Sequence, residues 1–403
     1  VHSILFFTAI IVLSCNDAFH SELTIIDNGY SNYTIVIPAL ATEIEKKAAY
    51  KLQYYLREMS GTKLKVIPEN KPWQSHAIYV GGCNSAKKLN IDFPALEEDG
   101  FSLKTQGQDF FICGGKRNGT LFGVYDFLEQ VGFRKYSPDA ELIPKKKLLR
   151  IPQYNITEIP VFHYRETLMP DASDPDYAEW HKLHHRSERE KDWGMWVHTF
   201  DDLIPPEKYF KEHPEYFSLN NGVRSSKTQL CLSNSNVLDL VILRLKDLIS
   251  KNPQASHWSI SQNDTYGPCE CSGCKNIDNQ YGGVPSGSLI HFVNQVAERF
   301  PNKVISTLAY QYSRKAPEGI KPAENVNIVL CTIELNRSRP IRTDPSSQGF
   351  VNDISNWKKL TNNILIWDYI VQFRNYLDPF PNLHVLQPNI QFFSDSGVHM
   401  MFE

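Results

Sequence analysis

The chain has no excess of basic residues, which argues against nucleic acid as a partner. It carries 42 Lys and Arg residues against 45 Asp and Glu residues, and its formal net charge is −3. Proteins that bind nucleic acid usually present a basic patch or stripe to the phosphate backbone. We therefore expect no nucleic acid among the partners of this protein.

Hydrophobic runs long enough to cross a membrane are also missing. The apolar stretch ILFFTAIIVLS at residues 4–14 is shorter than the about 20 residues that a bilayer-spanning helix needs. Its length is typical of a signal-peptide core, and it ends in Leu13-Ser14-Cys15, which resembles a bacterial lipobox. We predict that residues 1–21 are a signal segment lipidated at Cys15. The protein would then be exported to the periplasm or cell surface and anchored in the membrane; a buried strand is the alternative.

Cysteines are too sparse for a disulfide scaffold. Eight occur in 403 residues, and only Cys269, Cys271 and Cys274 lie close together in the sequence. Three thiolates at this spacing suit a structural Zn²⁺, with Cys231 as the candidate for the fourth ligand. A disulfide is the main competitor in an exported protein, and free thiols are the third interpretation. We expect no other cofactor.

Residues 22–152 show the alternation of strands and helices that is typical of a small α/β domain. Runs rich in β-branched residues predict strands at 22–29, 33–40, 63–69 and 77–82, and a hairpin at 99–115. Apolar residues at helical spacing predict helices at 42–60, with Gly61 at the stop, and at 118–131.

From residue 160 onward the pattern changes to strand, loop and helix, repeated. Eight apolar runs are expected to be strands, at 161–166, 193–200, 228–234, 257–264, 303–312, 325–334, 363–369 and 397–403. Near-continuous apolar strands indicate a parallel sheet buried on both faces. Eight of them alternating with helices predict a (β/α)8 TIM-type barrel over residues 160–403. No helix follows the eighth strand, so we interpret the barrel as truncated and the chain as a fragment of a longer protein.

Two sets of motifs resemble known families. The stretches AAYKLQYYLREMSGTKLKV, AIYVGG and DGFSLKTQGQDFFICGGKRNGTLFGVYDFLEQVGFRKYSPD resemble the N-terminal domain that precedes the barrel in α-glucuronidases and β-hexosaminidases. LCLSN, SISQNDTYGPCECSGCK and WDYIVQFRNYLDPFPNL are similar to domain-of-unknown-function family 4838, whose bacterial, often exported members are regarded as glycosidase-like. The resemblance implies a glycoside hydrolase-like protein acting on an oligosaccharide or polysaccharide.

Carboxylates at the carboxyl ends of the barrel strands are the candidates for catalysis, because active sites of this fold lie there and glycoside hydrolysis usually needs two carboxyl groups. Asp264 follows strand four, where the related hexosaminidases carry an Asp-Glu pair and this chain has Asn263-Asp264. Glu334 and Asp368 are the candidates for the second carboxylate. The alternatives are a turn-capping Asp264, a Glu334 paired with Arg337 or Arg339, and an Asp368 that organises hydrogen bonds at the rim. Glu166 and Glu403 are weaker candidates.

Other polar and aromatic residues at the same ends are candidates for substrate binding. They are Arg165, His198, Asn263, Tyr310, Trp367 and Tyr369. Arg165, Arg337 and Arg339 could bind the carboxylate of an acidic sugar in a bidentate manner. Ordinary structural ion pairs are the alternative role of these arginines. The histidines at 181, 184 and 185 are surrounded by charged residues, and we expect a solvated helix face there.

Two functions fit these observations. The first is an exported glycoside hydrolase acting on a complex or acidic carbohydrate. The second is a carbohydrate-binding lipoprotein with a degenerate, inactive barrel. A metal-dependent hydrolase ranks last, because the strand ends hold only one histidine.

Overall fold

The computed structural model describes residues 22–403, so the predicted signal segment and Cys15 lie outside the described residues. The chain forms two compact units, one made of residues 22–134 and 142–159 and the other of residues 135–141 and 160–403. Within residues 22–403, no helix combines the length and the apolar character that crossing a bilayer requires.

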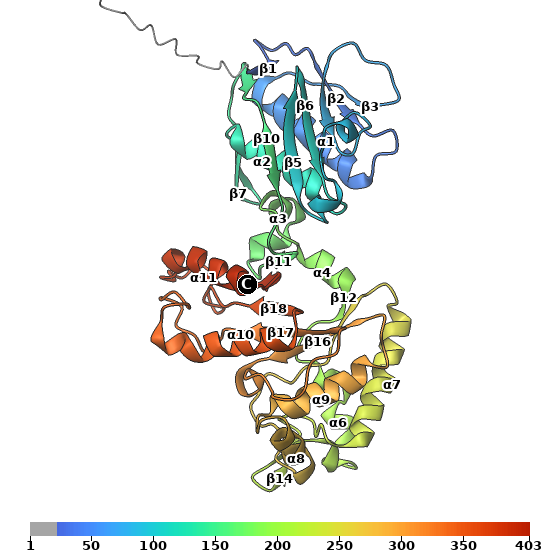
Figure 1. Ribbon diagram of the computed structural model, residues 1–403, viewed down its shortest axis with the longest axis vertical. Helices are drawn as coiled ribbons and strands as arrows, with labels where there is room; N and C mark the ends of the chain where they lie inside the picture. Colours follow the sequence, from blue (N-terminus) through green and yellow to red (C-terminus); the bar gives the residue numbers. More distant parts are fainter. Residues whose placement is uncertain (1–21) are drawn as a thin grey trace, which may run out of the picture. The chain divides into compact units, whose positions relative to one another are not determined.

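The first unit is a small α/β domain built on a six-stranded mixed sheet (Figure 1). The strand order is β10-β5-β6-β4-β2-β3, with β2 (Tyr33–Ile37), β3 (Val66–Pro68), β4 (His76–Val80), β5 (Phe101–Gln106), β6 (Asp109–Gly114) and β10 (Asn155–Glu158). Two helices, α1 (Glu43–Ser60) and α2 (Gly119–Gln130), pack against each other and against the sheet. The remaining elements are β1 (Leu23–Ile26), paired antiparallel with β9 (Leu149–Ile151), and the short helices η1 (Ala86–Lys88) and η2 (Pro94–Leu96).

The ends of α1 follow directly from its sequence. The Thr42 hydroxyl accepts a hydrogen bond from the Glu45 N–H at 3.2 Å, and the Glu45 carboxylate accepts one from the Thr42 N–H at 2.8 Å. This reciprocal capping box satisfies two backbone donors that a helix start leaves unpaired. Gly61 ends the helix in the left-handed conformation, with φ of +81°.

The second unit contains a curled, seven-stranded parallel sheet in the order β11-β19-β18-β17-β16-β15-β12 (Figure 1). Its strands are β11 (Tyr164–Glu166), β12 (Trp193–Met195), β15 (His257–Ser259), β16 (Val304–Ala309), β17 (Val326–Cys331), β18 (Ile364–Trp367) and β19 (Met400–Phe402). The predicted fold class, a small α/β domain followed by a barrel-type parallel sheet, is confirmed. Seven of the eight predicted barrel strands contain one of these strands.

Helices connect the strands of this sheet. They are α3 (Pro175–Trp180), α4 (Arg186–Asp192), α5 (Phe200–Leu203), α6 (Pro206–Tyr209), α7 (Ser235–Lys251), α8 (Ser272–Gln280), α9 (Ser286–Ala297), α10 (Gln348–Leu360) and α11 (Leu383–Asp395). Short elements complete the unit: η3 (Pro170–Ser173), η4 (Pro214–Tyr216), η5 (Gln311–Ser313), η6 (Pro345–Ser347), the pair β13 (Leu219–Asn220) and β14 (Val223–Arg224), and the pair β7 (Arg134–Ser137) and β8 (Ala140–Leu142), which begins and ends at the unit boundary.

Alternate residues of the central strands β16, β17 and β18 enter two different cores. Along β17, Ile328 and Leu330 belong to the large core that includes residues of the helices, whereas Val329 and Cys331 belong to a smaller cluster with Leu308 of β16. Successive side chains of a strand point to opposite faces of the sheet. The smaller cluster therefore lines the inner face of the curled sheet.

The predicted third strand is wrong as a strand. Residues 228–234 form only one isolated bridge, between Leu230 and Phe217. β12 pairs directly with β15, and Gly194 makes the close approach there, since a Cβ at this position would lie 2.3 Å from the Trp258 ring. The ladder thus has no place for another strand between β12 and β15.

The outer edge of β11 is covered by a histidine. Within residues 22–403 no ladder joins β11 to β12, so both are edge strands. The Arg165 N–H donates to His184 Nδ1 at 3.0 Å, and the His184 N–H donates to the Arg165 carbonyl at 2.7 Å. His184 is fully buried and its ring stacks on Tyr164. The expected solvated histidine face is therefore wrong for His184 and for His185, which is 8% exposed.

Candidate functional site at the strand ends

A cavity of about 390 Å³ lies at the carboxyl ends of the parallel strands. Its lining comes from the inner face of β16, β17 and β18 and from the loops that follow β11, β12, β15 and β18. The lining residues are Leu168, His198, Asp264, Leu308, Tyr310, Cys331, Ile333, Trp367, Tyr369 and Phe373. Five of the residues singled out in the sequence meet here, namely His198, Asp264, Tyr310, Trp367 and Tyr369.

Asp264 is the carboxylate of this cavity. The Tyr310 hydroxyl donates to its Oδ1 at 2.9 Å, and His198 Nε2 lies 4.0 Å from the same oxygen. The Asp264 side chain is 64% exposed, so its second oxygen is free to meet a ligand. Burial, and then the bond to Asp264, raise the pKa of Tyr310, which keeps its hydroxyl protonated as a donor.

His198 is fixed by Ser261 and Gln262, which follow β15. Its Nδ1 lies 2.8 Å from the Gln262 carbonyl, and its N–H donates to the Ser261 hydroxyl at 2.9 Å. A carbonyl can only accept, so Nδ1 carries a proton, and Nε2 is the ring nitrogen that faces Asp264. His198 has a φ of +57°, in the left-handed region that residues with a side chain seldom adopt.

Aromatic rings form one wall of the cavity. Trp367 and Tyr369 are near-parallel, at an interplanar angle of 18° with centroids 6.2 Å apart. The buried Trp367 Nε1 has no hydrogen-bond partner within residues 22–403. Burial raises the pKa of Tyr369, as do the nearby Cys331, Tyr310 and Asp264. The wall therefore presents flat apolar ring surface to the cavity.

The two candidates for the second carboxylate are not among the residues that line this cavity. Glu334 accepts from Arg314 at 3.0 Å, rather than pairing with Arg337 or Arg339, and its side chain is 37% exposed. Asp368 is 6% exposed and accepts from the Thr332 hydroxyl at 2.5 Å and from the Tyr369 N–H at 2.9 Å. Burial raises the pKa of Asp368, although these hydrogen bonds oppose the shift.

The remaining candidates for substrate binding are held by the protein itself. The Arg165 guanidinium donates to the Lys182 and Phe162 carbonyls. The Arg337 guanidinium donates to the carbonyls of Ile333, Leu335 and Tyr369.

Arg339 and Asn263 differ in how firmly they are held. The Arg339 side chain is 66% exposed, 3.8 Å from Asp344. Asn263 is buried, and its amide donates to Asp201 Oδ1 and the Thr228 carbonyl, both at 2.8 Å. Asn263 thus anchors the loop that carries Asp264.

A larger cavity, of about 990 Å³, lies near β11 and α11 within the same unit. It is mostly apolar, and its charged lining residues are Arg165, Glu166, Asp378 and Glu403. Glu166 is buried and bound to Tyr164 and to Arg189, whose guanidinium lies over the Trp196 ring at 4.5 Å. The smaller cavity is the candidate functional site, because there an exposed carboxylate, an imidazole and a phenol converge.

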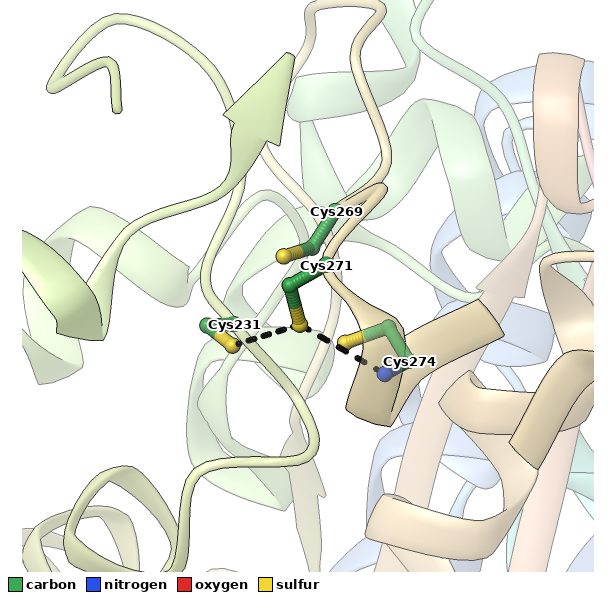
Figure 2. A group of neighbouring side chains, drawn as sticks. All are labelled: Cys231, Cys269, Cys271 and Cys274. Carbon is green, nitrogen blue, oxygen red and sulfur yellow. Dashed lines mark hydrogen bonds between the residues drawn. The ribbon is translucent and has the colours of Figure 1, made fainter. Parts of the chain in front are cut away.

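Four cysteine sulfurs come together beside the loop that follows β15. The Sγ atoms of Cys231, Cys269, Cys271 and Cys274 all lie within 4.8 Å of one another, and Figure 2 shows the side chains converging. All four are free thiols, and Cys231 lies 3.6 Å from Cys271. The four residues singled out in the sequence are thus the four that meet.

Sequence reasoning missed several lining residues. Leu168, Ile333, Cys331 and Phe373 give no chemical indication in the sequence, since apolar residues are read as core. The position of Cys331 at the end of β17, two residues after the inward-facing Val329, was the available indication.

Family models match both parts of the chain. One described as Domain of unknown function (DUF4838) matches residues 135–403, and one described as Glycosyl hydrolase family 67 N-terminus matches residues 28–127. No curated protein matches the chain.

Solved structures similar to this chain are glycoside hydrolases of low sequence identity. BtGH115A, described as a family GH115 4-O-methyl-α-glucuronidase with specificity for decorated arabinogalactans, is 11% identical with a TM-score of 0.52, over 94% of this chain and 54% of that one. CpGH84B is 12% identical with a TM-score of 0.49, over 95% of this chain and 65% of that one. The GH20 β-N-acetylhexosaminidase from Streptomyces coelicolor A3(2) is 12% identical with a TM-score of 0.47, over 95% of this chain and 82% of that one. The chain spans about half the length of BtGH115A, and the likeness to that protein shows the fold alone.

Proposed function

We propose, from the premise that this chain belongs to the DUF4838 family, that it is a glycoside hydrolase whose site is the smaller cavity. In this proposal Asp264 is the general acid/base. Glu334 or Asp368 supplies the second carboxylate.

The observation that carries the proposal is an exposed carboxylate inside an aromatic-walled cavity at the strand ends. The ring faces of Trp367 and Tyr369 would stack on a sugar. His198 Nε2 would form a hydrogen bond with another hydroxyl. The bond from Tyr310 holds Asp264 in place, so that its free oxygen can exchange a proton with the glycosidic oxygen.

The second carboxylate determines the stereochemistry. A retaining enzyme places its two carboxyl groups about 5–5.5 Å apart, and an inverting enzyme about 6.5–9.5 Å apart. Glu334 is the more exposed of the two candidates, whereas Asp368 is the more firmly held. A substrate that displaces Arg314 from Glu334 would free that carboxylate for the reaction.

An acidic sugar is the proposed substrate class. Arg339 has an exposed guanidinium, which makes it the arginine best able to reach a substrate carboxylate. The structurally similar BtGH115A is described as acting on a glucuronide, in line with this class.

The test is hydrolysis of a panel of chromogenic glycosides that includes α- and β-uronides and N-acetylhexosaminides. We expect turnover of at least one, and a loss of about 10²- to 10⁴-fold in kcat for Asp264→Asn, because general acid/base groups typically contribute this much. Asp239→Asn, on the exposed face of α7, is the matched control and should keep full activity. Full activity in the Asp264→Asn protein would show that Asp264 is not the acid/base.

A non-catalytic carbohydrate-binding lipoprotein is the second candidate. It is favoured by one observation: among residues 22–403, Asp264 is the only carboxylate that lines the smaller cavity. In that case calorimetry would detect saturable binding of an oligosaccharide without turnover, and Trp367→Ala would abolish the binding. Export through residues 1–21 and a lipid anchor at Cys15 are part of both proposals.

A further inference from the structure

The four-cysteine cluster has the dimensions of a tetrahedral thiolate site. Zn–S bonds of about 2.3 Å in a tetrahedron place the sulfurs about 3.8 Å from one another. Here all four Sγ atoms lie within 4.8 Å of one another, and the pair Cys231–Cys271 is 3.6 Å apart. The sulfurs surround one common point from two separate segments, residue 231 and residues 269–274 (Figure 2).

The same geometry does not correspond to disulfides. A disulfide requires sulfurs about 2.05 Å apart, and four half-cystines would form two separate pairs. The Cys231–Cys271 separation of 3.6 Å is far longer, and Ser233 Oγ lies within 3.6 Å of three of the sulfurs. One polar group common to several sulfurs indicates a single shared centre.

Donors around the sulfurs suit the thiolate form. The Leu219 N–H donates to Cys269 Sγ at 3.4 Å, and the Cys274 N–H donates to Cys271 Sγ at 3.5 Å. The Arg224 guanidinium reaches Cys269 Sγ at 3.7 Å. A Zn²⁺ with four thiolates carries a net charge of −2, so these donors and one cation offset part of it.

The backbone is shaped to bring the ligands close. Cys271 is the N-cap of α8 and Cys274 lies in its first turn, where the helix dipole favours negative charge. Gly273 lies between them, and a Cβ there would be 2.5 Å from the Ser233 hydroxyl. Only glycine at 273 allows the 231–233 segment to approach this closely.

We propose that Cys231, Cys269, Cys271 and Cys274 bind one structural Zn²⁺. The metal would join the segment that replaces the third barrel strand to the loop after β15. Gln229 lies two residues before Cys231; it donates to the carbonyls of Asn263 and Thr265 and accepts from the Asn263 N–H. These bonds flank Asp264, so the metal also positions the proposed acid/base.

The test is metal analysis of the purified full chain. We expect about one Zn²⁺ per chain by plasma mass spectrometry, falling below about a tenth in Cys271→Ser, since a structural site needs all four ligands. Cys83 is a buried thiol in the first unit, so Cys83→Ser is the matched control. The Cys83→Ser protein should contain as much zinc as the native protein. Cobalt exchanged into the site should show the intense visible absorption of a tetrahedral thiolate complex.

Three results would overturn the proposal. They are absence of metal after purification with added zinc, a cobalt spectrum without thiolate bands, and disulfides within the cluster in peptide mapping of the unreduced protein. If Cys271→Ser does not fold, the native protein's zinc content and cobalt spectrum still decide. None of these measurements depends on catalysis. A negative result would therefore contradict the zinc proposal without contradicting the glycosidase proposal.

Discussion

At the residue scale, the buried Asp368 and the partly buried Glu403 lie close enough for their charges to influence each other. Burial, and then the charge of Asp368, raise the pKa of Glu403 to about 7. In the unfolded chain this pKa is about 4.5. The folded protein therefore binds a proton that the unfolded chain releases between pH 4.5 and 7, and stability falls as the pH rises through this window.

Glu403→Gln should consequently stabilise the protein at pH 8 but not at pH 4.5. The shift from 4.5 to about 7 corresponds to ~3 kcal/mol at 1.36 kcal/mol per unit. Thermal unfolding at the two pH values measures the difference, with the exposed Glu324→Gln as the control. An equal effect of Glu403→Gln at both pH values would contradict the expectation.

Residue-scale chemistry was predictable where it depends on position along a strand. Asp264, Tyr310 and Trp367 were found because polar or aromatic residues ending apolar runs share one rim. The Arg314 partner of Glu334 was missed, because it comes from a different loop and no local pattern relates the two. His184 was missed because its charged neighbours in the sequence do not reveal that it fills a sheet edge.

At the element scale, most elements followed from periodicity and caps. The helices predicted at 42–60 and 118–131 correspond to α1 and α2 within one residue at each end. The prediction of the third strand was wrong because tertiary hydrogen bonds hold these residues elsewhere. Residues 228–234 have strand-like composition, but Gln229 and Cys231 bond to the 216–218 segment, while β12 pairs with β15. Which neighbour a segment pairs with depends on distant residues.

The cap of α1 gives an element-scale prediction. Thr42→Ala should lower the unfolding free energy of the first unit by about 1 kcal/mol, because the Glu45 N–H loses its acceptor. Thr42→Ser keeps the hydroxyl and should be close to the native protein. Urea unfolding of both variants measures this, and an equal loss in both would show that the cap hydrogen bond is not the cause.

At the scale of the whole molecule, the two units correspond to the two family matches, at residues 28–127 and 135–403, except that residues 142–159 of the second match belong to the first unit. Residues 135–141 belong to the second unit, whereas the sequence predicts one uninterrupted first domain over residues 22–152. A short hairpin, β7–β8, contains this boundary, and linear patterns do not show to which core a hairpin belongs.

Export is the prediction that concerns the molecule in its cell. We expect the mature protein to begin at a lipidated Cys15, because an apolar segment precedes Leu13-Ser14-Cys15. Mass spectrometry of detergent-extracted protein should find this modified N-terminus, and Cys15→Ala should leave the protein unlipidated. Protein recovered from the cytoplasm with residues 1–14 intact would refute it.

The histidine at the edge of β11 has a consequence for how separate molecules meet. An edge strand offers free backbone donors and acceptors, on which a strand from another copy can add and begin aggregation. At Arg165 both backbone groups are already bonded to His184, one through the ring and one through its N–H. Residues 22–403 form no ladder between β11 and β12, yet Arg165 is not a template there, because one buried side chain protects the sheet from intermolecular growth at that position.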